Sequence, residues 1–151
     1  MIRLRDARPD DEEFVVGLVP RFVEHGVAGG HTREEVIEGT SRVLREALRA
    51  QLGADALLVA EDEDGGRAGF VYATTHRDFF TGEAYAHVSE IAVARSGGGV
   101  GGELMDAIEC WSRERGYAMV TLNVVDANDG ARRFYERRGY AIGHCHYVKR
   151  L

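Results

Sequence analysis

Five glycines within six residues separate an apolar segment from a helix-like segment near the middle of the chain. Residues 97–102 read Gly-Gly-Gly-Val-Gly-Gly, after the strand-like run Val88–Ala94 and before the helix-like run Glu103–Arg115. Glycines leave main-chain N–H groups uncovered. The start of a helix adds unpaired N–H groups and the positive end of the helix dipole. The chain must therefore contain a strand–turn–helix unit, and its turn suits the phosphate or pyrophosphate of a nucleotide-containing cofactor.

Hydrophobic periodicity predicts a mixed sheet around this unit. Apolar runs and period-two alternation predict strands, and apolar residues at helical spacing predict helices. Helices are expected to begin near Pro9 and at Thr32, Val100 and Asn128, with capping pairs of Asp10 with Glu13 and of Thr32 with Glu35 at the first two starts. Strands are expected at residues 2–7, 56–61, 69–75, 84–94, 119–125 and 140–149. Adjacent strands followed by strand–helix alternation indicate an α/β fold with a mostly antiparallel central sheet and helices on both faces. With two prolines and no linker or repeat, we expect a single domain over residues 1–151.

Charge, hydropathy and cysteine content exclude several classes of partner. The formal net charge of −6 argues against nucleic acid, because binding phosphates broadly requires a basic face. No apolar run approaches the roughly 20 residues of a membrane helix, and no signal region is recognisable, so we expect no membrane partner. The two cysteines, Cys110 and Cys145, do not make a disulfide framework, which favours reduced thiols in a cytoplasmic protein.

The glycine run also matches G-x-G-x-x-G, the pattern of dinucleotide-binding sites, at Gly97, Gly99 and Gly102. Asp126 could serve as the later acidic residue of that pattern. However, little chain remains for a second mononucleotide-binding half, and the preceding strands look like an antiparallel meander. These features weigh against a nicotinamide enzyme. A glycine-rich turn without any ligand is the other alternative.

A second motif follows the next predicted strand, in the form N-x-x-A-x-x-F-Y-x-x-x-G-[FY]. Its positions are filled by Asn128, Ala131, Phe134, Tyr135, Gly139 and Tyr140. Together with Gly99-Val100-Gly101 before a helix, this motif resembles the GCN5-related N-acetyltransferase (GNAT) superfamily, most strongly over Val88–Tyr140. One departure is Ser96, which stands where the family's loop usually opens with Gln or Arg.

The resemblance implies acetyl-CoA as donor, an amine as acceptor and no metal. Main-chain N–H groups of residues 97–102 would hold the pyrophosphate, and the strand edge near Val93 would hold the pantetheine arm and the developing oxyanion. The implied cofactor-binding residues are Ile91, Ala92, Val93, Ser96, Gly97, Gly98, Gly99, Val100, Gly101, Gly102, Asn128 and Tyr135.

Two side chains are the candidate catalytic residues. Tyr135 would protonate the departing thiolate or at least hydrogen-bond its sulfur, since a phenol (pKa about 10) can donate to a thiolate whose conjugate acid has a pKa of about 8.5. Glu90 would take a proton from the acceptor ammonium, being the only carboxylate between Ala86 and Ala94. Asn123 occupies the place where some relatives carry a glutamate. The alternatives are an aromatic that packs beside Phe134 and a solvent-facing strand carboxylate.

The sequence leaves the acceptor open between a small-molecule amine, marginally favoured, and a peptide or protein amine. The acceptor pocket is expected between residues 22–32 and 75–87, which include Phe79, Phe80 and Tyr85. Neither motif contains a cysteine, so direct transfer in a ternary complex is expected. Homodimers are common among relatives. The alternative function is a non-catalytic sensor or interaction domain that binds CoA or acyl-CoA, which has no need of the Tyr135–Glu90 pair.

Overall fold

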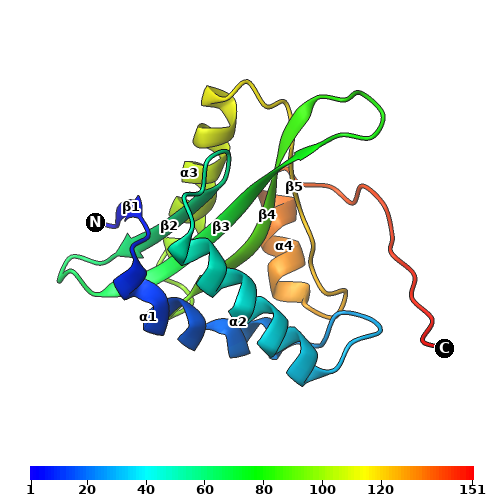
Figure 1. The fold of residues 1–151 in the computed structure, drawn as a ribbon, viewed down its shortest axis with the longest axis horizontal. Coiled ribbons are helices and arrows are strands. Elements are labelled where there is room, and N and C mark those ends of the chain that lie inside the picture. Colours follow the sequence, from blue (N-terminus) through cyan, green and yellow to red (C-terminus); the bar gives the residue numbers. More distant parts are fainter.

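The computed structural model describes all 151 residues and contains one five-stranded sheet with helices on both faces (Figure 1). The strands are β1 (Arg3–Asp6), β2 (Ala56–Glu61), β3 (Arg67–Arg77), β4 (Ala84–Val93) and β5 (Val120–Leu122). The helices are α1 (Glu12–Gly17), α2 (Arg33–Arg49), α3 (Val100–Glu114) and α4 (Asp129–Arg137), with short 3-10 segments η1 (Pro9–Asp11) and η2 (Val19–Val23) around α1. The predicted α/β class is confirmed. None of the helices has the length and apolar character needed to cross a lipid bilayer.

The sheet follows chain order, β1-β2-β3-β4-β5, and is mostly antiparallel as predicted. Only β4 and β5 run parallel, and they pair over just three positions, Ala86–Val88 against Val120–Leu122. Beyond Val88 the two strands have no register, whereas β4 continues to pair with β3 as far as Val93. The sheet therefore divides between β4 and β5 at the carboxyl end of β4.

Two apolar cores, one on each face of the sheet, hold the helices in place. Figure 1 shows α1 and α2 crossing one face, with α3 and α4 on the other. Leu44 of α2 and Phe70 of β3 are fully buried in the first core, and Leu104 and Ile108 of α3 are fully buried in the second. Each such side chain contributes about 1.5–3 kcal/mol on leaving water. This double packing fixes the sheet on which the candidate site is built.

Helix starts follow the sequence signals at one site and depart from them at another. Thr32 and Glu35 form the expected capping box, in which the Glu35 N–H donates to Thr32 Oγ1 at 3.1 Å and the Thr32 N–H donates to the Glu35 carboxylate at 2.8 Å. The expected pairing of Asp10 with Glu13 is wrong. The Asp11 carboxylate instead accepts the Arg8 N–H at 2.8 Å, because burial turns Asp11 inward and leaves Asp10 exposed.

Asp11 is a fully buried carboxylate that ties the amino-terminal segment to the sheet. Its oxygens accept from Arg5 of β1 at 2.8 and 3.0 Å and from Arg67 of β3 at 2.5 Å. Burial alone raises the pKa of this carboxyl, but the hydrogen bonds from Arg5 and Arg67 outweigh it and hold the pKa below its usual range. A buried charge is tolerated in this way only when it is paired and hydrogen-bonded.

Gly69 lets α3 approach the sheet closely. A Cβ atom at this position would lie 2.8 Å from the Ala92 carbonyl oxygen and 3.1 Å from the Val100 side chain. Real Cβ atoms do not approach other atoms that closely, so only glycine fits between β4 and the first turn of α3. The residue therefore sets where the amino end of α3 lies.

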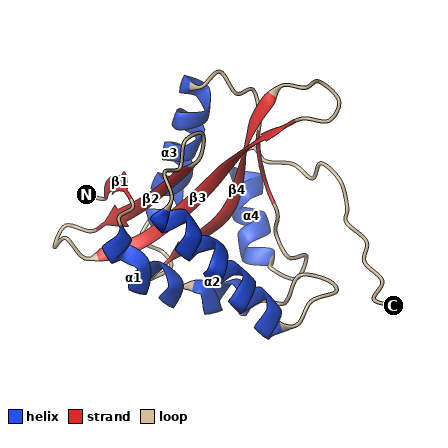
Figure 2. Cartoon of the chain, in the orientation of Figure 1, coloured by secondary structure: helices blue, strands red, loops and turns tan.

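The strand predicted over residues 140–149 is wrong. Residues 141–151 are exposed, have no regular secondary structure and run away from the sheet (Figure 2). The alternating pattern has no long edge to pair with, because β5 is only three residues long. The segment instead contacts the connection before α2. A Cβ at Gly30 would lie 2.6 Å from Val148, and Arg150 pairs with Glu35 at 3.5 Å.

Candidate active site

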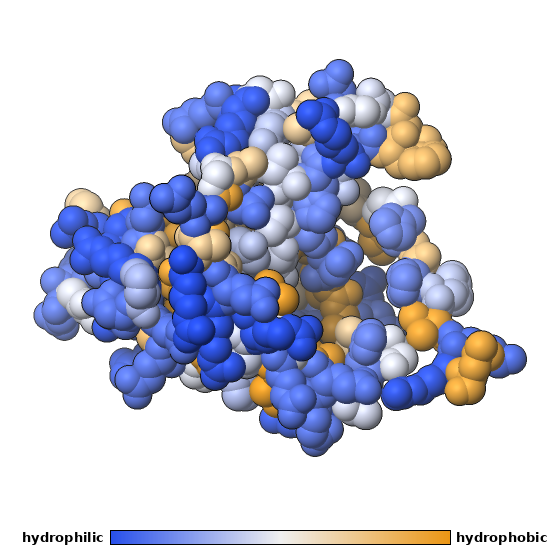
Figure 3. Space-filling view, viewed as in Figure 1, coloured by the Kyte–Doolittle hydropathy of each residue, from blue (hydrophilic) through white to orange (hydrophobic).

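The divergence of β4 and β5 opens a cleft with a volume of about 460 Å³. Its walls are the end of β4 (residues 88–93), the segment 122–125 that continues β5, and α4. Phe22, His25 and Ala28 from the connection before α2 complete it on the α2 side. Figure 3 shows a hollow beside α2 with apolar atoms in its depth. The sheet itself thus supplies a cavity in which main chain and side chains from both faces meet.

A β-bulge in β4 determines which side chains enter this cleft. Tyr72 pairs with Glu90 and Ala73 with Val88, which leaves Ser89 without a partner on β3. Val88 and Ile91 consequently pack against the α3 core, although an ordinary strand would place them on opposite faces. Ser89 and Glu90 both lie on the α2 face and line the cleft. The bulge therefore turns the polar pair of β4 toward the cavity.

Glu90 is mostly buried and has no hydrogen-bond or ion-pair partner in the chain. Burial raises the pKa of its carboxyl to about 7, because the charged form loses hydration that nothing replaces. A carboxyl group with such a pKa exchanges a proton readily near neutrality. The sequence-predicted base therefore lies in the cleft with the electrostatic property that a base needs.

Tyr135 reaches the cleft from α4. Its ring centroid lies 5.1 Å from Phe134 and 5.7 Å from Tyr140. Phe134 turns toward α3, 3.8 Å from the place where a Gly101 Cβ would be, whereas Tyr135 lines the cavity. Burial raises the pKa of Tyr135 to about 12, so the phenol keeps its proton. With its proton kept, the phenol can donate a hydrogen bond to a group in the cleft.

The glycine loop leads from the cleft into α3. Gly97 and Gly99 have φ angles of +89° and +75°, and a Cβ at either would meet no atom within 4 Å. The first bond of the helix runs from the Glu103 N–H to the Gly99 carbonyl, so the N–H groups of the first turn before Glu103 lack a helical acceptor. The loop is therefore open and rich in free donors.

The cofactor-binding residues predicted from sequence divide into two groups in space. Ile91, Ala92, Val93, Ser96, Asn128 and Tyr135 line the cleft. Residues 97–102 lie just past its end, in the loop and the first turn of α3. Asn128 also caps α4, because its side-chain oxygen accepts the Ala131 N–H at 3.1 Å. Cleft and loop are continuous through Ser96.

Two arginines make long-range contacts that the sequence patterns did not predict. Arg21 lines the cleft and donates to the Ala94 carbonyl at 2.8 Å, which ties η2 to the start of the glycine loop. Arg138, which follows α4, pairs with Glu109 of α3 at 3.1 Å and with Asp106. These two arginines connect elements that are distant in sequence, and no local pattern reports such contacts.

The aromatic residues at the tip of the β3–β4 hairpin do not reach the cleft. Phe79 and Phe80 are 91% and 89% exposed, and the apolar atoms at the projecting tip are visible in Figure 3. The expectation that they help to build the acceptor pocket is wrong, because the hairpin extends beyond the sheet. The connection before α2, the other expected wall, does line the cavity.

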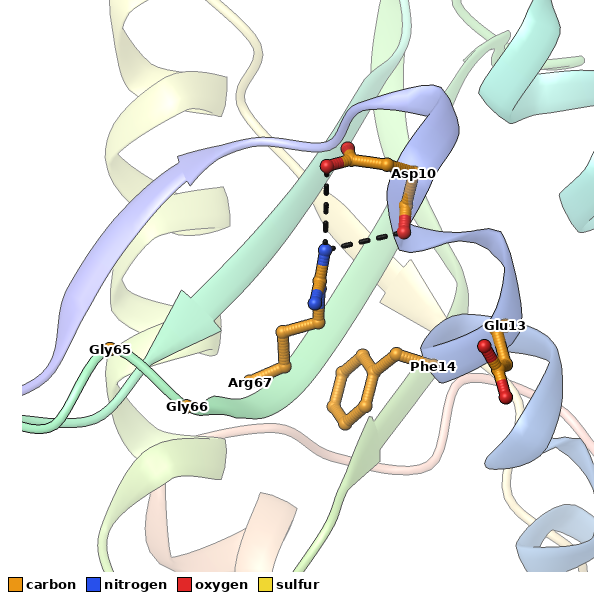
Figure 4. A pocket seen from close by; sticks show the side chains of 6 residues that line it. All are labelled: Asp10, Glu13, Phe14, Gly65, Gly66 and Arg67. Carbon is orange, nitrogen blue, oxygen red and sulfur yellow. Dashed lines mark hydrogen bonds and ion pairs between the residues drawn. The ribbon is translucent and has the colours of Figure 1, made fainter.

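A second hollow of about 400 Å³ lies on the β1 side of the sheet, away from β5, around η1, α1 and the β2–β3 turn (Figure 4). Two of its three charged groups already have partners, since Arg67 pairs with Asp10 at 3.6 Å and with Asp11. No group of three or more His, Cys, Asp or Glu side chains is arranged to hold a metal ion, and neither cysteine is in a disulfide. The β4–β5 cleft is therefore the candidate site.

The chain matches a family model and many solved structures. The model for the acetyltransferase (GNAT) family matches residues 28–140. A putative acetyl transferase from Pyrococcus furiosus has 26% sequence identity and a TM-score of 0.78, with each chain covered completely. A ribosomal-protein-alanine N-acetyltransferase from Brucella melitensis biovar Abortus 2308 has 20% identity and a TM-score of 0.73, again with complete coverage.

A third structure contains CoA. It is the aminoglycoside N-acetyltransferase AAC(6′)-Iy, with 18% identity and a TM-score of 0.71, covering 100% of this chain and 95% of that one. No curated protein matches the sequence. The family model covers most of the chain, including most of the cleft lining, the glycine loop and α4. The chain therefore belongs to the acetyltransferase (GNAT) family.

Proposed function

We propose that the chain is a single-domain cytoplasmic N-acetyltransferase that moves an acetyl group from acetyl-CoA directly to a primary amine. One observation carries the proposal. A single cleft, continuous with an open glycine loop, contains a partly buried carboxyl group from β4 and a partly buried phenol from α4. Direct transfer to an amine needs one group that takes a proton and one that gives a proton. Glu90 and Tyr135 are suited to these two roles.

The residues present fit CoA as the donor's carrier. The free N–H groups at the start of α3 and the open space at Gly97 and Gly99 provide a cradle for a pyrophosphate. Beyond Val88, the β4 edge that faces β5 has no strand partner, so it can bond an amide-rich chain laid along it. When bound, acetyl-CoA supplies an activated thioester. A β4 main-chain N–H near Val93 would stabilise negative charge at the thioester oxygen.

The proton chemistry follows from burial. An acceptor amine enters mostly as an ammonium ion, which has no lone pair until a proton leaves. Glu90, whose pKa is raised to about 7 by burial, takes that proton directly or through a water molecule. Tyr135, whose pKa is raised to about 12 by burial, remains protonated and donates to the leaving sulfur, and the second proton lost by the attacking nitrogen restores the phenol.

The acceptor is proposed to be a small cationic amine that enters from the α2 side. Glu24 and Glu90 line this part of the cleft, and carboxylates attract an ammonium group. A cavity of about 460 Å³ is within the range of small-molecule sites. The similar proteins named above act on an aminoglycoside and on a ribosomal-protein alanine, so the test must include a peptide.

Thiol release from acetyl-CoA, followed with a chromogenic thiol reagent, tests the proposal. The acceptors are spermidine, tryptamine, kanamycin, glucosamine 6-phosphate and a peptide that begins with alanine, with mass spectrometry of the product. We expect amine-dependent thiol release that falls in the Tyr135→Phe variant. Calorimetry with CoA is the companion measurement. CoA binding without acetylation of any acceptor would favour the non-catalytic binding module, and absence of CoA binding would refute both readings.

A further inference from the structure

A row of hydrogen-bonded polar side chains runs from the cleft to the surface of the sheet. Ser89 Oγ, which lies at the cleft, is 3.1 Å from Thr74 Oγ1 on β3. Thr74 Oγ1 is in turn 2.8 Å from His76 Nε2. Ser89 and Thr74 are partly buried, whereas His76 is exposed. Three side chains thus connect the cavity to bulk solvent without a gap wider than a hydrogen bond.

The bulge in β4 makes this row continuous. Along β3, the side chain of Ala73 faces α3. Thr74 and His76 follow it by one and three residues, so their side chains lie on the opposite face of the sheet, which α2 covers. Because Ser89 is the unpaired residue of the bulge, it lies on that same face and not among the apolar side chains packed on α3. Cross-strand hydroxyl pairs also stabilise sheets. A purely structural pair, however, has no need of a third partner that ends in solvent.

We propose that Ser89, Thr74 and His76 form a relay that carries the proton of the acceptor amine from the cleft to solvent. A proton arrives at Ser89 Oγ from the Glu90 side of the cleft as the Ser89 proton passes to Thr74 Oγ1. The Thr74 proton passes to His76 Nε2, and the Nδ1 proton of His76 leaves to water. Each O–H bond that breaks is replaced by one that forms, whereas His76 is left with its proton on Nε2. Because His76 is exposed, exchange with water returns it to the Nδ1 tautomer before the next turnover.

This inference rests on the proposed function, which creates the need for such a path. An ammonium and a thioester give an amide, a thiol and one free proton, so every turnover must discharge a proton. Glu90 has no hydrogen-bond partner in the chain, and a water molecule in the cleft suffices to connect it with its neighbour Ser89. Hydroxyl groups both donate and accept, and imidazole takes and releases protons near neutral pH.

His76, and not the adjacent histidine, is the exit. His87 is partly buried, with its ring centroid 5.5 Å from that of His76 and its Nδ1 2.8 Å from Thr121 Oγ1. Burial, with a smaller contribution from His76, lowers the pKa of His87 and disfavours its charged form. Thr74 approaches only the main-chain oxygen of His87, at 3.5 Å. His76 is therefore the imidazole that both contacts the hydroxyl row and meets solvent.

The first test measures the proton position directly and needs no acceptor. An outward relay requires that Thr74 donates to His76 Nε2, so neutral His76 must carry its proton on Nδ1. Two-bond proton–nitrogen correlation spectra of the nitrogen-15-labelled protein at about pH 8 identify this tautomer. The expected result is a bare Nε2 that gains a proton when Thr74→Val removes the hydroxyl. A proton on Nε2 in the unsubstituted protein would overturn the relay.

The second test compares Thr74→Val with Thr74→Ser, which keeps the hydroxyl, using the best acceptor of the panel above. In weakly buffered solution we expect Thr74→Val to lower kcat about 10-fold and Thr74→Ser to leave it nearly unchanged. Added imidazole should restore kcat of Thr74→Val, because a soluble base replaces the missing relay. Equal kcat for the two variants, or a loss that imidazole does not restore, would refute the relay. If the unsubstituted protein acetylates no acceptor, the proposed function is refuted independently of the relay. The tautomer of His76 then still shows whether Thr74 donates its hydrogen bond outward to His76.

Discussion

Replacing Glu90 by glutamine should stabilise the folded protein at alkaline pH and not at acidic pH. Burial raises the pKa of Glu90 from 4.5 to about 7, so the folded state binds the proton more tightly than the unfolded state. Stability contributed by the protonated carboxyl is therefore present below about pH 4.5 and is lost as pH rises through about 7. A shift of this size corresponds to about 3 kcal/mol. Glutamine does not titrate, so Glu90→Gln escapes that loss.

Urea unfolding at pH 4.5 and pH 8.5 measures the effect. The difference in unfolding free energy between Glu90→Gln and the unsubstituted protein should grow by up to about 3 kcal/mol between the two pH values. Glu83→Gln is the control, since Glu83 is exposed at the end of the β3–β4 hairpin, and its difference should stay near zero. A Glu90→Gln difference that does not change with pH would refute the buried, unpartnered carboxyl and with it the electrostatic case for Glu90 as base.

The remaining predictions concern the proton donor, the glycine loop and the buried carboxylate. Tyr135→Phe should lower kcat about 100-fold and leave the calorimetric Kd for acetyl-CoA within about 2-fold, and an unchanged kcat would remove Tyr135 from the reaction. Gly99→Ala should lower stability by about 1 kcal/mol, since its φ of +75° strains any side chain, whereas Gly98→Ala should cost less. Equal melting temperatures for those two variants would contradict the loop geometry. Asp11→Asn should cost about 3–5 kcal/mol in urea unfolding and the exposed Asp10→Asn under 1 kcal/mol, and comparable losses would contradict the buried ion pairs.

The sequence predicted those elements whose structure depends on residues close together in the chain. The capping box of Thr32 and Glu35 depends on residues three apart, and it forms as expected. The strand over Ala56–Glu61 was predicted with its observed bounds, since a short apolar run between turn residues has few other solutions. The strand expected over residues 140–149 does not form. Alternation of apolar and polar residues shows that a segment can pair as a strand, but it does not show whether a sheet edge is available for it.

The candidate site was predictable to the extent that motifs encode it. Glu90, Asn128 and Tyr135 were selected from sequence, and the structure brings all three to one cleft. Arg21 and Thr74 were not selected, because their contacts join elements far apart in the chain, and periodicity cannot report them. Residues 97–102 were expected at the site, but they lie just beyond the cleft, where only a long carrier such as CoA would reach them.

The unpaired residue of β4 is a position at which this strand could be shortened without turning its other side chains. Removing Ser89 would restore simple alternation, so Val88 and Ile91 would stay among the apolar side chains packed on α3, and Glu90 would stay beside the cavity. The deletion would remove only the hydroxyl that contacts Thr74. A single-codon deletion at Ser89 should therefore keep the fold, as a deletion in the exposed segment 141–151 should. Homologous sequences that carry a gap at this one position would still place their carboxylate where Glu90 lies.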